Sequence, residues 1–267
     1  MRMVVLSDNI SKSDLNSEWG LSCFLEFDQH KILLDTGASD LFIENASKLG
    51  VDLNEIEYAI LSHAHFDHGN GMEAFFRIND HAKFYLQKSC ASNCYIKKQI
   101  FTYYCGLPSK VLSKYKDRIV RCDIEEKITD GIYVVGHKTK DLDLIGKDHD
   151  MYKRVKRKWV YDDFDHEQSL IFDTDDGLII FNSCCHGKVV NIIKEVSDTF
   201  KDKKIYAIVG GFHLYDRSED EIKALAKYLK DKDIKIYTGH CTGDRAMAIF
   251  NELLNVNELY VGMDVEI

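Results

Sequence analysis

The sequence predicts a single α/β domain with mixed β-sheets over residues 1–267. Two observations favour this fold class. Short apolar runs of strand length alternate with segments of helical periodicity, and no linker separates independent domains. A chain of 267 residues with 45% hydrophobic residues is long enough to bury a large core. Its single proline, Pro108, excludes proline-rich linkers and polyproline ligands.

The first third of the chain predicts a β-hairpin, a helix and a further strand. The apolar runs 21–27 and 31–34 are separated only by the polar turn 28–30, so we expect them to pair antiparallel. Helical apolar spacing follows, with Asp40 near its start and Gly50 at its end. In chain order, the expected elements are strands 3–6, 21–27 and 31–34, helix 40–49, strand 56–61 and helix 72–78.

The middle of the chain has the weakest periodicity. Two segments rich in tyrosine and lysine, near 90–104 and 109–116, predict helices. Strands are expected near 118–122 and 131–136. A polar stretch at about 137–166 then predicts a long irregular excursion from the scaffold.

From residue 168 onwards, strands and helices alternate regularly. An Asp-Gly turn at 176–177 predicts a hairpin between the first two strands of this part. The expected elements are strands 168–173 and 178–182, helix 188–197, strand 204–209, helix 219–230, strand 234–238, helix 244–254 and a strand near 258–261.

Composition excludes several classes of partner. The chain has 35 Lys and Arg against 44 Asp and Glu, a formal charge of −9, so we expect no nucleic-acid partner. No apolar run approaches the roughly 18 residues of a membrane helix, and the apolar patch near the N-terminus is too short for a signal peptide. The eight cysteines predict small buried residues of a reduced protein. We therefore expect a cytoplasmic protein without a membrane partner.

Four candidate metal ligands, His63, His65, Asp67 and His68, lie within six residues directly after a predicted strand. In extended backbone, residues two apart project to the same side, so His63 and His65 can converge on one ion. The chain then turns, which lets Asp67 and His68 address a second ion beside the first. Nitrogen and oxygen donors of this kind suit Zn²⁺, with Mn²⁺ or Fe²⁺ as alternatives. This spacing disfavours the alternative of four unrelated loop residues.

The segments around these residues resemble those of a known family. LSHAHFDHGNG at 61–71 is similar to the H-x-H-x-D-H signature of the metallo-β-lactamase superfamily, and LLDTG at 33–37 resembles the Asp-Gly element that precedes it. The resemblance implies a four-layered αββα sandwich, in which two mixed β-sheets are flanked by helices. It also implies that His240, in TGHCTG after the strand 234–238, belongs to the second metal site.

Between these motifs the chain departs from the common pattern of the superfamily. Most members have a bridging Asp at the end of the strand that here ends at Cys184. E-x-S-L at 167–170, GGFHL at 210–214 and HCTG at 240–243 more closely resemble one subfamily. That subfamily is the 7,8-dihydropterin-6-yl-methyl-4-(β-D-ribofuranosyl)aminobenzene-5′-phosphate synthase-like group. The G-C-S-H segment of that subfamily ends in a His, and His186 stands at the matching position here.

Five further residues are candidates with stated alternatives. His186 is expected to replace the missing ligand rather than to begin a helix, and Cys184 is either a thiolate ligand or a buried apolar residue. Two alternatives are open for His213: a contact with substrate or metal, or a buried structural role. Glu167 orients a ligand, substitutes for one or is an exposed loop residue, whereas Asp35 is expected to accept a hydrogen bond from a ligand histidine. The other histidines are expected to be ordinary surface or loop residues: His30, His81, His137, His149 and His166.

A basic cluster lies in the polar excursion. Five of the six residues 153–158 are Lys or Arg, and most such runs are solvated faces. Because Trp159 and two tyrosines are interleaved, the cluster is alternatively a lid for an anionic, aromatic substrate, with Arg154 and Arg157 gripping a phosphate.

These residues predict a metal-dependent hydrolase that acts on a small anionic substrate through a metal-bound hydroxide, because two adjacent divalent ions lower the pKa of a shared water to near neutrality. Asp67 is also expected to orient the nucleophile. The alternatives are a dihydropterin-type synthase that uses the same ions and a non-catalytic metal or ligand sensor. Diiron flavoproteins also resemble this superfamily, but they usually have Glu where His65 stands and add a flavodoxin-like domain. Diiron redox chemistry is therefore disfavoured for this chain. One ion is assigned to His63, His65 and His186, and the other to Asp67, His68 and His240.

Overall fold

The computed structural model describes residues 1–267 and contains two seven-stranded mixed sheets. In the first sheet, antiparallel pairing from β18 through β3 gives way to parallel pairing from β3 through β8. Its strands, in spatial order, are β18 (Asp264–Glu266), β1 (Arg2–Ser7), β2 (Ser22–Phe27), β3 (His30–Leu34), β4 (Tyr58–Ile60), β5 (Lys83–Gln87) and β8 (Ile119–Cys122).

The second sheet repeats this pattern, with antiparallel pairing from β9 to β14 and parallel pairing from β14 to β17. The hairpins expected at 21–34 and around the 176–177 turn are both confirmed. Its strands, in spatial order, are β17 (Val256–Glu258), β16 (Lys235–Thr238), β15 (Ile205–Gly210), β14 (Gly177–Phe181), β13 (Gln168–Thr174), β10 (Ile132–Gly136) and β9 (Glu125–Thr129).

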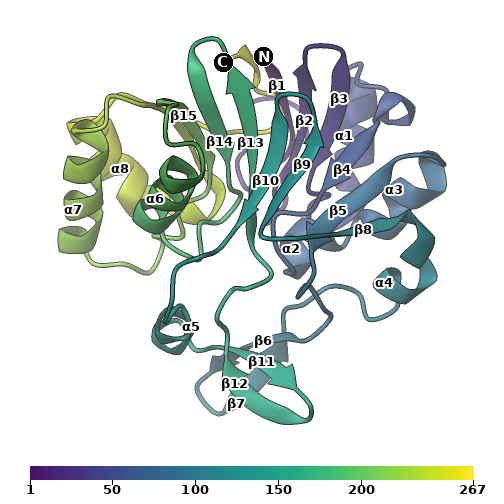
Figure 1. Ribbon diagram of the computed structural model, residues 1–267, viewed down its shortest axis with the longest axis horizontal. Coiled ribbons are helices and arrows are strands. Elements are labelled where there is room, and N and C mark those ends of the chain that lie inside the picture. Colours follow the sequence, from purple (N-terminus) through teal and green to yellow (C-terminus); the bar gives the residue numbers. More distant parts are fainter.

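Helices cover the outer faces of the two sheets. In Figure 1, α1, α3 and α4 lie beside the first sheet, and α6, α7 and α8 lie beside the second. The helices are α1 (Leu41–Lys48), α2 (Phe66–Gly69), α3 (Met72–Ile78), α4 (Val111–Lys114), α5 (Asp143–Asp148), α6 (Val189–Thr199), α7 (Glu219–Lys230) and α8 (Asp244–Leu253), with 3₁₀ turns at Leu53–Glu55, Lys116–Arg118 and His240–Thr242. The molecule is therefore an α/β domain with mixed sheets, as the sequence pattern predicts, and has the four layers of the αββα sandwich that the resemblance implies. None of these helices is both long and apolar enough to span a bilayer.

The central strands are buried on both faces, which is why they read as continuous apolar runs. Along β1, Met3 and Val5 pack between the two sheets, while Val4 and Leu6 pack under α1 and α3. Successive side chains of a strand point to opposite faces, so one apolar run serves two core layers. A third apolar cluster lies between the second sheet and helices α6 to α8. All eight cysteines are buried and unpaired, as expected.

A third, four-stranded sheet projects from one end of the sandwich (Figure 1). The segment 137–166, expected to be irregular, instead contains α5 and two strands of this sheet. The helix expected near 90–104 is wrong, because that segment forms the other two strands of the sheet. Its strands are, in order, β12 (Lys158–Tyr161), β11 (Met151–Val155), β6 (Cys94–Lys98) and β7 (Phe101–Tyr104). Both β7 and β12 are exposed along their whole length, so the alternation that marks a half-buried strand is absent.

Candidate metal centre

The candidate ligands lie in loops that follow the carboxyl ends of four strands. The segment from His63 to His68 follows β4 and continues into α2, and His240 follows β16. His186 follows β14 and His213 follows β15, which pair in parallel. Loops after parallel strands meet at one edge of a sheet, and this places residues that are far apart in sequence around one site.

The first group joins His63, His65 and His186, one ligand atom of each lying within 4.8 Å of the others. The ring centroids of His63 and His186 are 4.9 Å apart, and those of His65 and His186 are 4.7 Å apart. Nε2 of His63, Nε2 of His65 and both ring nitrogens of His186 are buried without a hydrogen-bond partner. Unpaired buried nitrogens are costly, so their convergence fits a site for a cation.

The second group joins Asp67, His68 and His240, again with ligand atoms within 4.8 Å of one another. Asp67 Oδ2 lies 3.8 Å from His68 Nε2 and 3.8 Å from His240 Nε2. The same oxygen accepts a hydrogen bond from Trp19 Nε1 at 3.0 Å. Both predicted groups of three are therefore brought together by the fold.

Cys184 lies at the border between the two groups. Its Sγ is 3.2 Å from His68 Nε2, and it forms a possible three-residue site with His63 and His68. Cys241 Sγ lies 3.4 Å from Cys184 Sγ on the other side. Cys184 is thus placed between the two groups, and a thiolate is a zinc ligand.

Electrostatics favour neutral imidazoles at four of the five candidate ligand histidines. The exception is His68, where burial lowers the pKa but the carboxylates of Asp67 and Asp35 outweigh it and raise the pKa. Burial, followed by the proximity of the other histidines, lowers the pKa of His63, His65, His186 and His240 well below the ordinary value. Burial also raises the pKa of the Asp67 carboxyl and that of the Cys184 thiol. Neutral imidazoles keep a lone pair for a cation, and a bound cation reverses the cost of ionising the carboxyl and the thiol.

Three polar residues orient the ring nitrogens on the far side of the site. Asp35 Oδ2 accepts a hydrogen bond from His68 Nδ1 at 2.8 Å, as the sequence predicts. Ser62 Oγ lies 2.8 Å from His63 Nδ1 and donates to Asp35 Oδ2 at 2.6 Å. With Ser62 donating to Asp35, its oxygen is left to accept from His63 Nδ1, which leaves Nε2 of His63 without a proton.

The third orienting residue is Asn9, whose Oδ1 lies 2.9 Å from His240 Nδ1. Asn9 Nδ2 donates to the His240 carbonyl oxygen at 3.1 Å, so both ends of the amide hold the same histidine. Sequence analysis missed Asn9 and Ser62. Because Ser62 directly precedes His63, its position in the motif could have indicated that it orients this histidine. Asn9 lies 231 residues from its partner His240, so no local pattern links the two.

Glu167 is buried and acts on a ligand through the backbone. Its carboxylate accepts hydrogen bonds from the backbone N–H groups of His186 at 2.9 Å and Gly187 at 2.8 Å. It also pairs with His137 Nε2 at 2.5 Å, while His137 Nδ1 pairs with Glu195. The expectation that His137 is an ordinary surface residue is therefore wrong. The structure places Glu167 as a positioning residue for the loop that presents His186.

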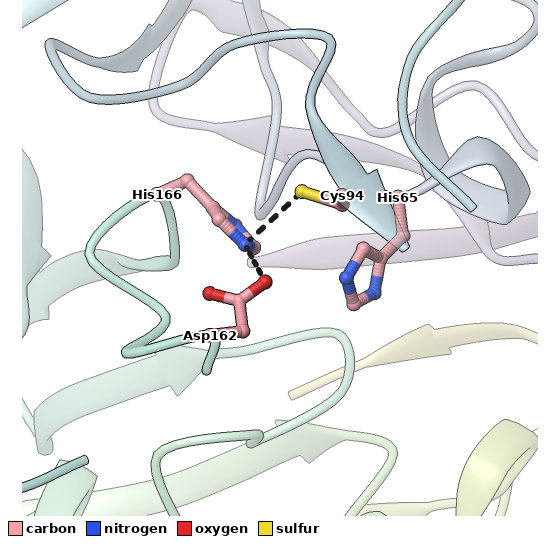
Figure 2. A group of neighbouring side chains, drawn as sticks. All are labelled: His65, Cys94, Asp162 and His166. Atoms are coloured by element: carbon pink, nitrogen blue, oxygen red, sulfur yellow. Dashed lines mark hydrogen bonds and ion pairs between the residues drawn. The ribbon is translucent and has the colours of Figure 1, made fainter. Parts of the chain in front are cut away.

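A second buried cluster contains His65 itself, together with Cys94, Asp162 and His166 (Figure 2). His166 Nε2 lies 3.2 Å from Asp162 Oδ2 and 3.5 Å from Cys94 Sγ, and the backbone N–H of Ala64 donates to His166 Nδ1 at 3.2 Å. The expectation of an ordinary loop role for His166 is wrong, because it is 2% exposed. The cluster joins the projecting sheet to the loop that contains His65.

Four non-glycine residues at or beside the site have left-handed backbone. Asp35, Cys185, His213 and His240 have φ values of 58°, 49°, 51° and 48°. Each such non-glycine residue costs free energy, and such strain gathers at functional sites. Close packing also requires glycine after the histidine motif, since a Cβ on Gly71 would lie 2.4 Å from the Thr36 carbonyl oxygen.

The metal groups open into a cavity of about 440 Å³. Its walls include Trp19, Phe66 and Lys98, together with His213, whose ring centroid lies 4.3 Å from that of His186. Arg154 and Arg157 are exposed and are not among the lining residues. Arg154 instead stacks on Trp159, 5.6 Å from its ring centroid. Lys98, which the sequence analysis did not single out, is the cation that lines the cavity.

Comparison with known proteins is consistent with this geometry. Residues 20–153 match the sequence family described as the Metallo-beta-lactamase superfamily. The chain is 30% identical over 251 residues to the 7,8-dihydropterin-6-methyl-4-(beta-D-ribofuranosyl)-aminobenzene-5'-phosphate synthase of Methanocaldococcus jannaschii, an alignment that covers 88% of this chain and 85% of that protein.

Solved structures agree with the fold. Tm1679, described as a metal-dependent hydrolase of the beta-lactamase superfamily, superposes with a TM-score of 0.81 and 27% identity, covering 100% of this chain and 99% of the other. The metallo-beta-lactamase fold protein YhfI of Bacillus subtilis shares the fold with a TM-score of 0.60, 11% identity and 99% coverage of both chains. The fold, the histidine motif and these similarities show that the chain belongs to the metallo-β-lactamase superfamily.

Proposed function

We propose that the protein is a metal-dependent hydrolase with a two-ion zinc centre that acts on a small anionic substrate. The observation that supports this proposal most strongly is the pair of adjacent ligand groups, in which buried imidazole nitrogens lack any other partner. Both groups border the same cavity of about 440 Å³, so a substrate in the cavity reaches both. Imidazole and carboxylate donors suit Zn²⁺, with Mn²⁺ or Fe²⁺ as alternatives.

Each residue has a defined part in this proposal. One ion would be held by His63, His65 and His186, and the other by Asp67, His68 and His240. When bound, the ions supply Lewis-acid chemistry and lower the pKa of a coordinated water. Asp67, which Trp19 fixes by a hydrogen bond, would also orient the attacking water, and the Cys184 thiol, 3.2 Å from His68 Nε2, would be available as a further ligand.

The lining of the cavity favours an anionic substrate with an apolar body. Lys98 supplies a positive charge at the mouth and makes no salt bridge, while Trp19, Ile96 and Met151 supply apolar surface. A local cation attracts a small anion even though the whole chain has a charge of −9. We also propose a cytoplasmic location, because eight unpaired buried cysteines fit a reducing compartment.

A synthase is the second candidate. The relative that is 30% identical, in an alignment that covers 88% of this chain, is named as a synthase. Two ions that stabilise a leaving diphosphate would serve a condensation as well as a hydrolysis. Fold and metal motif alone do not choose between these reactions.

The test is turnover by the metal-loaded protein, with and without a chelator, on two sets of substrates. One set contains phosphoesters, diphosphates and lactones, and the other pairs a dihydropterin diphosphate with an aminobenzene ribotide. We expect chelator-sensitive hydrolysis that is lost in His68→Ala and retained in His81→Ala, the exposed control. Condensation without hydrolysis favours the synthase, and metal binding without turnover on either set favours a sensor.

A further inference from the structure

One histidine of the first group lacks the hydrogen bond that holds other ligand histidines from behind. Nδ1 of His63, of His68 and of His240 each lies 2.8–2.9 Å from a side-chain oxygen. By contrast, neither ring nitrogen of His186 has a hydrogen-bond partner. A ligand binds an ion more tightly when its ring is already fixed in the productive orientation. The orientation of the His186 ring therefore depends on packing.

Phe164 lies flat against the His186 ring. The two ring centroids are 4.8 Å apart and the ring planes differ by 9°. Phe164 is fully buried, so this contact is part of the interior. Aromatic rings attract each other in such an arrangement. A flat neighbour at this distance also blocks rotation of the imidazole out of its plane, which keeps its nitrogens directed towards the ion.

The backbone of Phe164 is held in a costly conformation. Its φ of 50° lies in the left-handed region, which a bulky residue adopts only where its surroundings impose it. Asp162 Oδ1 accepts a hydrogen bond from the backbone N–H of Phe164 at 2.9 Å. The Phe164 carbonyl oxygen accepts another from the backbone N–H of Glu167, also at 2.9 Å. The position of the Phe164 ring is therefore fixed from both sides.

The other oxygen of Asp162 fixes His166 (Figure 2). Asp162 Oδ2 lies 3.2 Å from His166 Nε2, and His166 Nδ1 accepts the backbone N–H of Ala64 at 3.2 Å. A nitrogen that accepts an N–H has no proton, so the proton of the neutral ring is on Nε2 and is donated to Asp162. Ala64 stands between His63 and His65, so His166 holds the backbone that spaces these two ligands.

The same segment is anchored to the projecting sheet. It begins directly after β12, and the backbone N–H of Asp162 donates to the Met151 carbonyl oxygen at 3.0 Å. Lys153 of β11, which is 6% exposed, pairs with both Asp163 and Asp165. The turn at the base of the projecting sheet is thus held by the sheet on one side and contacts the first group of ligands on the other.

We infer that residues 162–166 are the positioning element of the first group, in which Phe164 orients His186 and His166 orients His63 and His65 through Ala64. The inference rests on the two-ion centre of the proposed function. It makes the affinity for the first ion depend on the base of the projecting sheet, while the affinity for the second ion does not.

The test is zinc affinity, measured by competition with a chelating dye for one group at a time. A His240→Ala background keeps the first group intact, and a His186→Ala background keeps the second. We expect Phe164→Leu to weaken binding by the first group about two- to twelvefold, the equivalent of the roughly 0.5–1.5 kcal/mol of an aromatic pair. Binding by the second group should not change.

The matched control is Phe250→Leu, which truncates another fully buried ring, in the cluster between the second sheet and helices α6 to α8. It should leave the zinc affinity of both groups unchanged, although it removes the same atoms from the interior. This comparison separates positioning of a ligand from a general loss of stability.

His166 is tested by a loss and a rescue in the same His240→Ala background. His166→Leu removes the acceptor of the Ala64 N–H and should weaken binding by the first group about 10- to 100-fold. His166→Asn places a side-chain oxygen where Nδ1 stands and should restore most of the affinity. Equal losses in both variants would overturn the role assigned to His166.

Unchanged affinity of the first group in Phe164→Leu, or equal weakening of both groups, would overturn the inference. Phe164→Leu keeps the test decisive where His166→Leu fails to fold, because leucine is a conservative replacement in a core. Wild-type protein that binds no zinc would refute the metal centre together with the inference. The measurement needs no turnover, so absence of hydrolysis with these affinities observed would count against the proposed hydrolase alone.

Discussion

The individual ligand histidines are held from behind by hydrogen-bond acceptors. Asp35 accepts from His68 Nδ1, and Asn9 lies within hydrogen-bond distance of His240 Nδ1. A proton fixed on Nδ1 leaves Nε2 free to face a cation, and a fixed ring needs no reorientation when the ion binds. The proposed metal centre therefore predicts that the affinity for an ion depends on residues that do not touch the ion.

Replacing Asp35 tests this dependence. In Asp35→Asn we expect zinc affinity to fall about 10- to 100-fold, because the amide orients His68 without the charge that polarises the ring. Asn tolerates left-handed backbone, so the φ of 58° at this position adds no confounding strain. Zinc titration against a chelating dye measures the affinity. Asp40→Asn, at an exposed carboxylate, is the control, and equal affinity in both variants would refute the role of Asp35.

At the scale of elements, one buried histidine ties α6 to the second sheet. His137 follows β10 and pairs with Glu167 before β13 and with Glu195 on α6, at 2.5 Å and 2.9 Å. Burial alone would lower the pKa of His137, but the two carboxylates outweigh burial and raise it to about 10. The ring is therefore charged in the folded protein at neutral pH.

This pairing predicts a pH-dependent stability. Because the folded pKa of about 10 exceeds the ordinary value of 6.5, the contribution of His137 is complete below about pH 6.5 and is lost as the pH rises towards 10. Urea unfolding should show wild type more stable than His137→Gln at pH 6, with the difference shrinking steadily up to pH 10. The exposed variant His81→Gln should show no such trend. A difference that is constant from pH 6 to pH 10 would contradict the assigned pairing.

Sequence patterns predicted most elements of the sandwich but not those of the projecting sheet. Strands such as β1 and β14 are apolar on both faces and stand out at once, whereas β7 and β12 are exposed along their length and resemble loops or helices. The histidine motif revealed four site residues because they are adjacent in sequence. His137 and Asn9 could not be found in this way, since their partners lie 30 to 231 residues away.

For the whole molecule, the layer between the two sheets holds the halves of the site in register. Phe172 of β13 is fully buried there, with its ring centroid 5.1 Å from that of Phe27 and 5.6 Å from that of Phe181. The first sheet presents His63 to His68 and the second presents His186 and His240, so a site formed by both requires this interface.

Truncation of this layer should destabilise the fold as a unit. We expect Phe172→Ala to lower the free energy of unfolding by about 3–5 kcal/mol, the usual cost of a cavity left by a buried aromatic ring. Phe101→Ala should change it by less than about 0.5 kcal/mol, because Phe101 is 57% exposed. Urea unfolding monitored by circular dichroism gives both values. A loss below about 1 kcal/mol in Phe172→Ala would contradict the tight packing assigned to this layer.

The central claim is a two-ion centre built from two groups of three residues. It is tested most directly by elemental analysis of protein loaded with zinc and then dialysed against metal-free buffer. We expect two zinc ions per chain in wild type and in His81→Ala, and one in each of His186→Ala and His240→Ala, since each variant removes a ligand from a different group. Fewer than two ions in wild type, or two ions retained in both ligand variants, would contradict the assignment.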